Sequence, residues 1–274
     1  MGDRPLAGKA VLVTGAARGV GRAIAEELAA LGADIAVTAR TVEPRGDDLT
    51  GTIGETAAAI EAVGSKALAI GADLSKVADR QRIVDETLGA FGKLDILVNN
   101  AADTSDNVFR GFWETTPEEW AAQIDLNLNA MYWLMKAFAP GMKAQGGGLI
   151  VNLGSMREIP EGLDGMGGRV NGTVRLGAAY PTSKVAIFAM TTLIARELAE
   201  DNIVVATVNP GAARSESFVH NANRFGFPIE MSTPLACPAK TVGFLATSDA
   251  PLTYAATYID AVTFATDHGL VAAE

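Results

Sequence analysis

The segment from Thr14 to Gly21 constrains the fold of this chain more than any other feature of its sequence. Its residues are Thr-Gly-Ala-Ala-Arg-Gly-Val-Gly, and they stand between a short apolar run at residues 11–13 and a helical pattern rich in alanine and leucine. Side chains at Gly15, Gly19 and Gly21 would obstruct a tight turn, the approach of a phosphate or the packing of the helix. The segment therefore predicts a dinucleotide-phosphate loop, with a tight turn that binds no ligand as the alternative.

Strand and helix patterns alternate along the whole sequence, with no internal repeat and no recognisable linker. This alternation predicts one α/β domain over residues 1–274, built on a single doubly wound parallel sheet of the Rossmann type with helices on both faces. The expected strands are 11–13, 35–39, 67–70, 94–98, 149–153, 204–208 and 258–262, and the expected helices are 21–31, 55–63, 76–91, 116–143, 180–200 and 239–247.

Composition excludes several classes of function. The 274 residues carry a formal net charge of −10 and no run of lysine or arginine, which argues against nucleic acid and an anionic membrane surface as partners. One cysteine and two distant histidines show no spacing typical of a metal site, so no metal is expected. The N-terminus is polar and no stretch suits a membrane helix, so we expect a cytoplasmic protein.

A second feature is the pair formed by Tyr180 and Lys184 in the sequence Tyr-Pro-Thr-Ser-Lys. Residues four apart share one face of a helix, and Pro181 suits a first turn, so the phenol and the ammonium are expected side by side near a helix start. On its own this spacing also fits a structural pair. Together with the glycine loop, it indicates hydride transfer.

The end of the second strand should decide which dinucleotide binds. An acidic residue there would hydrogen-bond the adenine ribose of NAD, but Ala39 holds the corresponding position and Arg40 follows it. Arg18 lies in the glycine loop itself. Two guanidinium groups near this ribose favour the additional phosphate of NADP, and the alternative is that both are solvated surface arginines.

Several further segments occur in the order typical of one family. From about Lys9 to the last expected strand, the chain resembles the short-chain dehydrogenase/reductase family. The segments that carry the resemblance are Thr14 to Gly21, Asp73-Leu74, Asn99-Asn100-Ala101, Asn127, Ser155, Tyr180 to Lys184 and Asn209-Pro210-Gly211. The resemblance implies an NADP(H)-dependent oxidoreductase that acts on a small-molecule alcohol or ketone.

The resemblance also implies a catalytic set of Asn127, Ser155, Tyr180 and Lys184. Tyr180 would exchange a proton with the substrate oxygen, and Ser155 would hydrogen-bond that oxygen. Lys184 would bind the nicotinamide ribose, and Asn127 would anchor a water that links the lysine to solvent. Lowering a tyrosine pKa from about 10 to about 7 requires about 4 kcal/mol. One cation about 5 Å away supplies about 3 kcal/mol at an effective dielectric constant near 20, so the lysine and an oxidised nicotinamide together would be sufficient.

The cofactor contacts follow from the same resemblance. Asp73 is expected to fix the adenine edge, whereas Asn99 is expected to brace the sheet. The expected cofactor-binding set comprises Gly15, Ala17, Arg18, Gly19, Val20, Gly21, Arg40, Asp73, Leu74, Asn100, Ala101, Ala102, Tyr180, Lys184, Pro210 and Gly211.

The chain departs from the family pattern at three places. Ala102 stands where the family has glycine, so the backbone beside the cofactor must accept a Cβ. The threonine customary after Gly211 is absent, and Ser215 or Ser217 would have to contact the nicotinamide amide. An insertion at about residues 157–178 should border the substrate cleft, either as a flap that shapes it or as a solvated loop.

Two further expectations concern the surroundings of the site. Residues 212–235 form a lid over the substrate in the family, and ordinary packing of a peripheral helix is the alternative. The helical segments that contain residues 131–135 and 185–190 are apolar nearly all round, and related enzymes pair them between subunits, so we expect a homotetramer or a homodimer.

Two other functions remain open at this point. A catalytically silent NADP(H)-binding regulatory protein would be consistent with the departures at Ala102 and after Gly211. An NAD-linked dehydrogenase of the same family would follow if the two arginines do not contact the cofactor.

Overall fold

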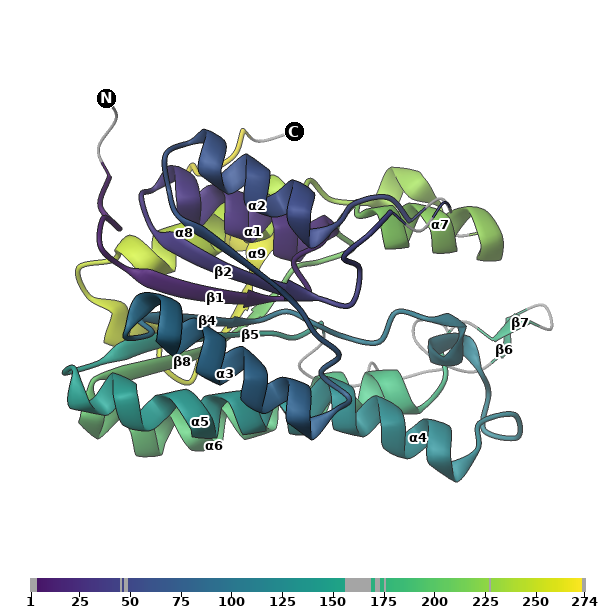
Figure 1. Ribbon diagram of the computed structural model, residues 1–274. Coiled ribbons are helices and arrows are strands. Elements are labelled where there is room, and N and C mark those ends of the chain that lie inside the picture. Colours follow the sequence, from purple (N-terminus) through teal and green to yellow (C-terminus); the bar gives the residue numbers. More distant parts are fainter. Residues whose placement is uncertain are drawn as a thin grey trace.

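Seven parallel strands form one sheet in the order β3-β2-β1-β4-β5-β8-β9, which confirms the predicted doubly wound parallel sheet (Figure 1). The computed structural model describes residues 4–44, 46, 49–155, 169–170, 173–174, 176–226 and 228–272. The strands of the sheet are β1 (Ala10–Thr14), β2 (Asp34–Ala39), β3 (Ala67–Gly71), β4 (Ile96–Asn99), β5 (Gly148–Leu153), β8 (Ile203–Asn209) and β9 (Tyr258–Asp260).

Helices cover both faces of this sheet, and each face has its own cluster of buried apolar side chains. The α-helices are α1 (Gly19–Ala30), α2 (Ile53–Ala62), α3 (Val77–Phe91), α4 (Pro117–Ile124), α5 (Ala130–Ala144), α6 (Ala179–Leu198), α7 (Glu216–Phe225), α8 (Ala236–Thr247) and α9 (Ala261–Asp267). In Figure 1, α1, α2, α8 and α9 lie above the sheet, and α3, α4, α5 and α6 lie below it. Within the described ranges, no helix is both long and apolar enough to span a membrane.

The central strand β1 places the glycine loop at the point where the strand order reverses. All five residues of β1 are buried, as expected for a strand covered on both faces. Val13 pairs with Val37 of β2 on one side and with Val98 of β4 on the other, so the three strands end at the same edge of the sheet. The crevice outside the carboxyl ends of the strands at such a reversal is where open α/β sheets bind ligands.

Most predicted elements differ from the observed ones by one to three residues at an end, and two of the differences have an identifiable structural cause. The expected helix 116–143 is interrupted, because residues 125–129 form a π-helix, η2 (Asp125–Asn129), between α4 and α5. The expected strand 258–262 ends at Asp260, because the Asp260 side chain accepts a hydrogen bond from the backbone N–H of Thr263 and so caps α9. A local side-chain cap therefore ends the strand pattern before Val262.

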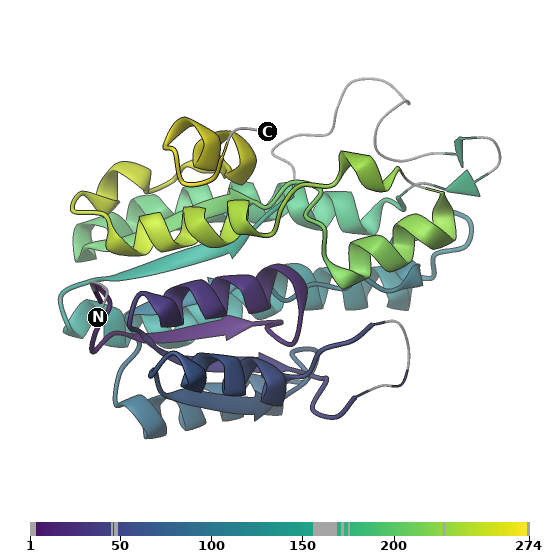
Figure 2. The same cartoon turned by 90° about the horizontal axis from the view of Figure 1, so that it is seen from above.

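The segments that flank the crevice lie beyond the carboxyl ends of the strands. The expected lid, 212–235, contains α7, whose N-cap is Ser215. Of the expected insertion, residues 169–170 and 173–174 form a short antiparallel ladder, β6 (Arg169–Val170) and β7 (Thr173–Val174), while 157–168, 171–172 and 175 lie outside the described residues. Figures 1 and 2 both show α7 and this ladder at the same end of the molecule.

Candidate active site

The glycines of the loop after β1 are required by close approach of the backbone to the end of β4. A Cβ atom on Gly21 would lie 2.4 Å from the side-chain nitrogen of Asn100 and 2.6 Å from the carbonyl oxygen of Gly15. A Cβ atom on Gly15 would lie 2.8 Å from the Cα atom of Ala101. Gly15 also has a φ of 67°, which disfavours any residue with a side chain. The loop therefore keeps its shape only with glycine at these positions.

Thr14 holds the glycine loop and the segment after β4 together, which the sequence did not indicate. Its hydroxyl oxygen accepts hydrogen bonds from the backbone N–H groups of Asn100 at 3.0 Å and Ala101 at 3.1 Å. The Asn100 side chain in turn donates to the carbonyl oxygens of Thr14 at 2.9 Å and Gly15 at 3.1 Å. The sequence shows a threonine at the end of β1, but nothing in it indicates that this threonine joins the two segments. Thr14 does so only because β4 pairs with β1.

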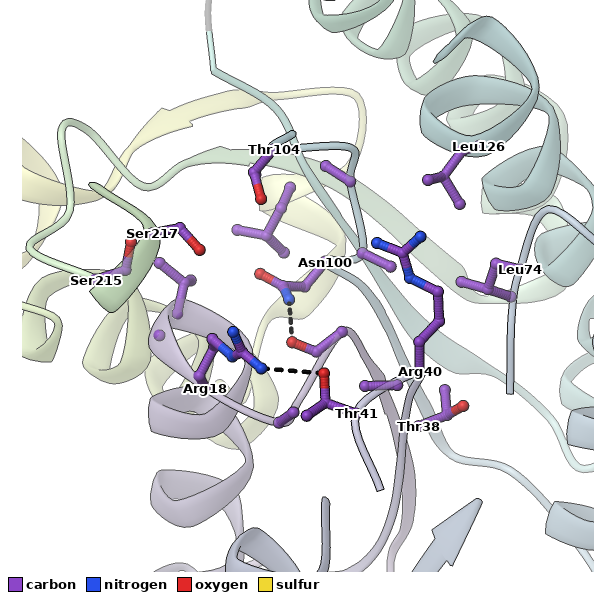
Figure 3. Close-up of a pocket in the computed structure, with 18 of the residues that line it drawn as sticks. Arg18, Thr38, Arg40, Thr41, Leu74, Asn100, Thr104, Leu126, Ser215 and Ser217 are labelled. Atoms are coloured by element: carbon purple, nitrogen blue, oxygen red, sulfur yellow. Dashed lines mark hydrogen bonds between the residues drawn. The ribbon is translucent and has the colours of Figure 1, made fainter. Parts of the chain in front are cut away.

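A cavity of about 290 Å³ lies next to the loop at the carboxyl ends of the strands. Its wall contains every residue of the expected cofactor-binding set except Gly21, which packs against Asn100, and Gly211, which packs near Thr233 and Val262. Ser215 and Ser217 also lie on the wall (Figure 3). Sequence reasoning missed a group of wall residues that mostly follow strand ends: Thr38, Thr41, Leu49, Ala72, Thr104, Leu126, Leu153 and Gly154.

Two arginines flank the part of the cavity beside the end of β2. The Arg18 guanidinium donates to the hydroxyl of Thr41 at 3.0 Å and to the carbonyl oxygen of Gly51 at 3.3 Å. Arg40 is exposed and forms no hydrogen bond or ion pair with the residues that the structure describes. Figure 3 shows its side chain extending into the cavity between Asn100 and Leu74. At this end of the cavity, the Arg18 guanidinium is thus held in place by hydrogen bonds, whereas the Arg40 guanidinium can bind a ligand.

Asp73, the acidic residue on the same wall, is held by its own turn. Its carboxylate accepts hydrogen bonds from the backbone N–H of Ser75 at 3.0 Å and from the Ser75 hydroxyl at 2.8 Å. Its backbone N–H donates to the carboxylate of Asp79 at 2.7 Å. These bonds fix the loop after β3, which forms the far side of the cavity.

Tyr180 and Lys184 lie together at the start of α6, as their spacing predicts. The Lys184 Nζ atom is 5.6 Å from the centre of the Tyr180 ring and donates to the carbonyl oxygen of Leu153 at 3.0 Å. Ser155, just after β5, forms a side-chain hydrogen bond with Tyr180. Both α6 residues also lie on the cavity wall, so the phenol and the ammonium face the same space as the glycine loop.

Burial controls the titration of this pair. It raises the pKa of Tyr180 to about 12, against the opposing effect of the Ser155 hydrogen bond and with a smaller contribution from the negative charge of Asp103. Burial also lowers the pKa of Lys184 to about 8. The protein groups alone therefore do not make the phenol acidic, in contrast to the direction expected from the lysine, because the effect of removal from water exceeds that of the Ser155 hydrogen bond.

Asn127 lies in the π-helix and connects two segments of the site. Its side-chain oxygen accepts a hydrogen bond from the backbone N–H of Asp103 at 2.8 Å, and its side-chain nitrogen donates to the Ser183 hydroxyl at 3.0 Å. The Ser183 hydroxyl donates to the carbonyl oxygen of Tyr180 at 2.7 Å. Asn127 thus positions the first turn of α6 against the segment after β4.

Two neighbouring residues, Asn99 and Ala102, complete the description of this region. The side chain of Asn99 donates to that of Asn152 across β4 and β5 at 2.9 Å, so Asn99 braces the sheet. In the described part of the chain, the non-glycine residues with positive φ are Asn202 and Ala256. Ala102 therefore has an ordinary backbone conformation.

Contacts between distant segments also hold together the residues that follow β4, those that precede α6 and the helix α7. Arg224 of α7 forms an ion pair with Asp106 of η1 (Asp106–Phe109). The rings of Phe109 and Phe225 lie next to this pair, with their centres 4.2 Å apart. The backbone N–H of Gly177, just before α6, donates to the carbonyl oxygen of Val108 at 2.6 Å. These contacts bring η1, α7 and the start of α6 together.

Comparison with known proteins identifies relatives over nearly the whole chain. Residues 9–224 match the family model described as short chain dehydrogenase. A 3-oxoacyl-[acyl-carrier-protein] reductase from Synechocystis is 32% identical over 272 residues, which cover 97% of this chain and 98% of the relative. A 2-dehydro-3-deoxy-D-gluconate 5-dehydrogenase from Dickeya dadantii is 30% identical and covers 97% of each chain. The crystal structure of a metagenomic short-chain oxidoreductase in complex with NADP has a TM-score of 0.71 and 31% identity, over 93% of this chain and 97% of that one.

Proposed function

We propose that this chain, which belongs to the short-chain dehydrogenase family, transfers hydride between NADP(H) and an alcohol or ketone substrate. Membership of the family makes the protein an NAD(P)-dependent oxidoreductase that acts on a small molecule. One observation carries the more specific proposal: Tyr180 and Lys184 share a cavity wall with the glycine loop and with Arg40.

The cavity fits a nicotinamide dinucleotide. The loop leaves no space for side chains at Gly15 and Gly21, which brings backbone N–H groups to the start of α1, where a pyrophosphate would bind. The Thr38 hydroxyl is buried beside the cavity and has no hydrogen-bond partner within the described ranges. Lys184 would hold the nicotinamide ribose. When bound, the nicotinamide supplies the hydride for ketone reduction or accepts it in alcohol oxidation.

Tyr180 is the proposed proton donor and acceptor. Because burial raises its pKa to about 12, its phenol stays protonated near neutral pH, which suits donation to the oxygen of a ketone. Ser155 would donate a hydrogen bond to the same substrate oxygen and stabilise its developing charge. Lys184, whose pKa is lowered by burial to about 8, is mostly charged near neutral pH and stabilises the phenolate that remains after proton transfer.

Asn127 is proposed to support the return of a proton to Tyr180. Its contacts with Asp103 and Ser183 place it beside the first turn of α6, and the family precedent assigns to this position a water that links the lysine to solvent. Asn127 therefore belongs to the same catalytic set as Tyr180. Loss of the water would slow the return of a proton to the phenol of Tyr180.

The preference for NADP is proposed from the end of β2. Arg40 extends into the cavity and has no ion-pair partner among the described residues, and Thr41 holds Arg18 at the same end of the cavity, so both could contact a ribose 2′-phosphate. The relative that binds NADP supports this choice. The competing proposal, an NAD-linked enzyme, is distinguished by comparing the affinities for NADPH and NADH.

We also propose the domain organisation and the assembly of the protein. A single domain over residues 1–274 would carry a substrate-loop insertion at about 157–178 and a lid at about 212–235, whose helix α7 is held by the Arg224–Asp106 ion pair. Tyr132 on α5 and Leu193 on α6 are 49% and 61% exposed, which favours pairing of these helices in a cytoplasmic homodimer or homotetramer.

The proposed reaction is tested by mixing the protein with NADPH and a panel of ketones while the absorbance of NADPH is followed. Turnover of at least one ketone, lost in Tyr180→Phe, is the expected result. Tight binding of NADPH without turnover on a broad panel would instead favour the catalytically silent regulatory protein.

A further inference from the structure

Helix α3 carries a buried positive charge that no step of the proposed reaction uses. Arg80, near the amino end of this helix, is 3% exposed. Arginine is almost never buried to this extent without partners, because the loss of hydration of a charged group is costly. Its Nε atom donates to the carbonyl oxygen of Leu74 at 2.6 Å, and a terminal nitrogen forms an ion pair with the carboxylate of Asp125. Arg80 therefore joins the loop before α3 to the π-helix η2.

The two partners of Arg80 belong to two stretches of the cavity wall. Leu74, whose carbonyl oxygen accepts the first bond, lines the cavity itself. Asp125, which forms the ion pair, directly precedes Leu126, another residue of the wall. Figure 3 shows Leu74 and Leu126 on the same side of the cavity. The guanidinium therefore sets the spacing between the loop after β3 and η2.

Asp125 also fixes the start of the π-helix. Its carbonyl oxygen accepts a hydrogen bond from the backbone N–H of Ala130, five residues further on, which closes the wide turn of this helix. Within the turn, the side chain of Asn127 is completely buried and bonds to the Asp103 backbone and to the Ser183 hydroxyl. A displacement of Asp125 would therefore move Asn127, and with it the contact to the first turn of α6.

The shape of the arginine side chain suits a contact with two segments. A guanidinium presents its donors in a planar fork, so it can hold two acceptors that lie in different directions, whereas a lysine has a single nitrogen. Arg82, two positions along α3, provides a contrast. It donates to the carbonyl oxygen of Gly71 at 2.6 Å and pairs with Asp79 and Glu86, so its partners among the described residues lie on β3 and α3. Of these two arginines, Arg80 is the one that reaches η2.

We propose that Arg80 is a positioning residue, which holds Leu74 and Asp125 at a fixed spacing. Through Asp125 it keeps Asn127 against the first turn of α6. The inference rests on the proposed function, in which Asn127 supports the return of a proton to Tyr180, and it adds the buried contact that keeps Asn127 in place. Arg80 itself does not line the cavity, so it acts on cofactor binding through Leu74 and on turnover through Asn127.

Arg80→Met tests the proposal, because methionine removes both contacts without leaving an unpaired charge in the interior. We expect the dissociation constant of NADPH to rise about three- to tenfold, because the cavity wall is no longer held in its binding arrangement. We expect kcat for ketone reduction to fall about tenfold, because Asn127 is displaced. Arg82→Met is the matched control and should leave both quantities unchanged. Fluorescence titration and steady-state kinetics measure them, and the thermal unfolding midpoint of each variant shows whether the fold is retained.

A double-mutant cycle separates positioning from a general structural role. If Arg80 acts on turnover through Asn127, then Arg80→Met should lower kcat no further in a protein that already carries Asn127→Ala. The losses from two independent sites would instead multiply. Asp125→Ala should give the same result as Arg80→Met, because it removes the same ion pair from the other side. Arg80→Lys should restore little of kcat, since an ammonium group does not reproduce the fork of the guanidinium.

The outcomes distinguish this proposal from the proposed reaction. Multiplied losses in the cycle, or wild-type kcat in both Arg80→Met and Asp125→Ala, would overturn the positioning role while ketone turnover by the wild type stands. Full activity in Arg80→Lys would overturn the contact with two segments. A wild type that binds NADPH and reduces no ketone would overturn the proposed reaction. The affinity for NADPH would then decide the role of Arg80, because Arg80→Met must lower it and Arg82→Met must not.

Discussion

The two sides of the cavity are held together in different ways. On the cofactor side, main-chain atoms of the glycine loop lie against Asn100 and Ala101, at distances that leave no space for an added Cβ. On the side that the proposed lid would cover, an exposed ion pair joins Asp106 to Arg224 and the rings of Phe109 and Phe225 are in contact. Exposed ion pairs contribute only about 0–1 kcal/mol, so the Asp106–Arg224 pair adds little to the stability of its region, whereas the packing of the glycine loop tolerates no added atom.

The two ends of helix α7 contact different regions of the site. A Cβ on Gly19 would lie 2.9 Å from the Cβ of Ser215, so the amino end of α7 packs against the phosphate loop. Its carboxyl end carries Arg224 and Phe225, which contact η1. Movement of the weakly held end about the tightly packed one would open the substrate side without disturbing the cofactor side.

The largest effect is expected where the two sides meet, at Tyr180. Tyr180→Phe removes the proton donor and should lower kcat by about 10²- to 10⁴-fold. The affinity for NADPH should stay within about twofold of wild type, because the substitution removes one hydroxyl. Steady-state kinetics and NADPH fluorescence titration measure the two quantities. The control is Tyr132→Phe on α5, which should leave kcat unchanged, and full activity in Tyr180→Phe would exclude the proposed donor.

The tight packing of the cofactor side is tested by Gly21→Ala. The added Cβ would lie 2.4 Å from Asn100 and 2.6 Å from the Gly15 carbonyl, so the loop must rearrange. An overpacking cost of about 1–3 kcal/mol predicts an increase of about five- to 150-fold in the dissociation constant of NADPH. Gly89→Ala on α3, where a Cβ would meet nothing within 4 Å, is the matched control. Wild-type affinity in Gly21→Ala would show that the loop is not rigid.

The pH dependence of alcohol oxidation should follow the ionisation of Tyr180. Burial raises the pKa of this phenol to about 12, so the phenolate that accepts the alcohol proton is scarce at neutral pH and increases as the pH rises. We expect kcat/KM for oxidation to rise about tenfold per pH unit below pH 8. Above the Lys184 pKa of about 8 the rise should weaken, because the lysine loses its charge. A rate that falls with increasing pH would contradict this assignment.

Arg40→Ala separates the two dinucleotides. Loss of a charge-assisted hydrogen bond of about 1.5 kcal/mol predicts an increase of about tenfold in the dissociation constant of NADPH, with that of NADH nearly unchanged. Arg22→Ala, which removes a half-buried arginine paired with Glu26 on α1, serves as the control. An equal loss of affinity for NADPH and NADH would contradict the proposed contact between Arg40 and the 2′-phosphate.

The smallest effect is expected at the substrate side. Arg224→Gln and Asp106→Asn should each raise KM by up to about fivefold and leave the affinity for NADPH unchanged, because an exposed ion pair is worth at most about 1 kcal/mol. The double substitution should add little to either single one, since both remove the same contact. A change in NADPH affinity in these variants would show that the two sides of the cavity are coupled.

Residues that act through local spacing were predictable. Residues four apart, such as Tyr180 and Lys184, share one face of a helix whatever surrounds that helix. Glycines such as Gly15 and Gly21 are needed wherever a strand leads into a loop of this type. In contrast, the role of Thr14 depends on the pairing of β1 with β4, far away in the sequence. The strand predicted up to Val262 was also too long, because Asp260 forms a cap that a pattern of apolar residues does not reveal.

The amino-acid sequence alone was enough to establish the parallel sheet, the glycine loop and the tyrosine–lysine pair, because short-range periodicity and steric limits on the backbone dictate them. Only the folded chain decided that burial raises the pKa of Tyr180, that Arg40 extends into the cavity, and that Asp106 meets Arg224. These properties depend on which distant segments surround a side chain and on how much water they exclude, and neither is encoded in its immediate neighbours.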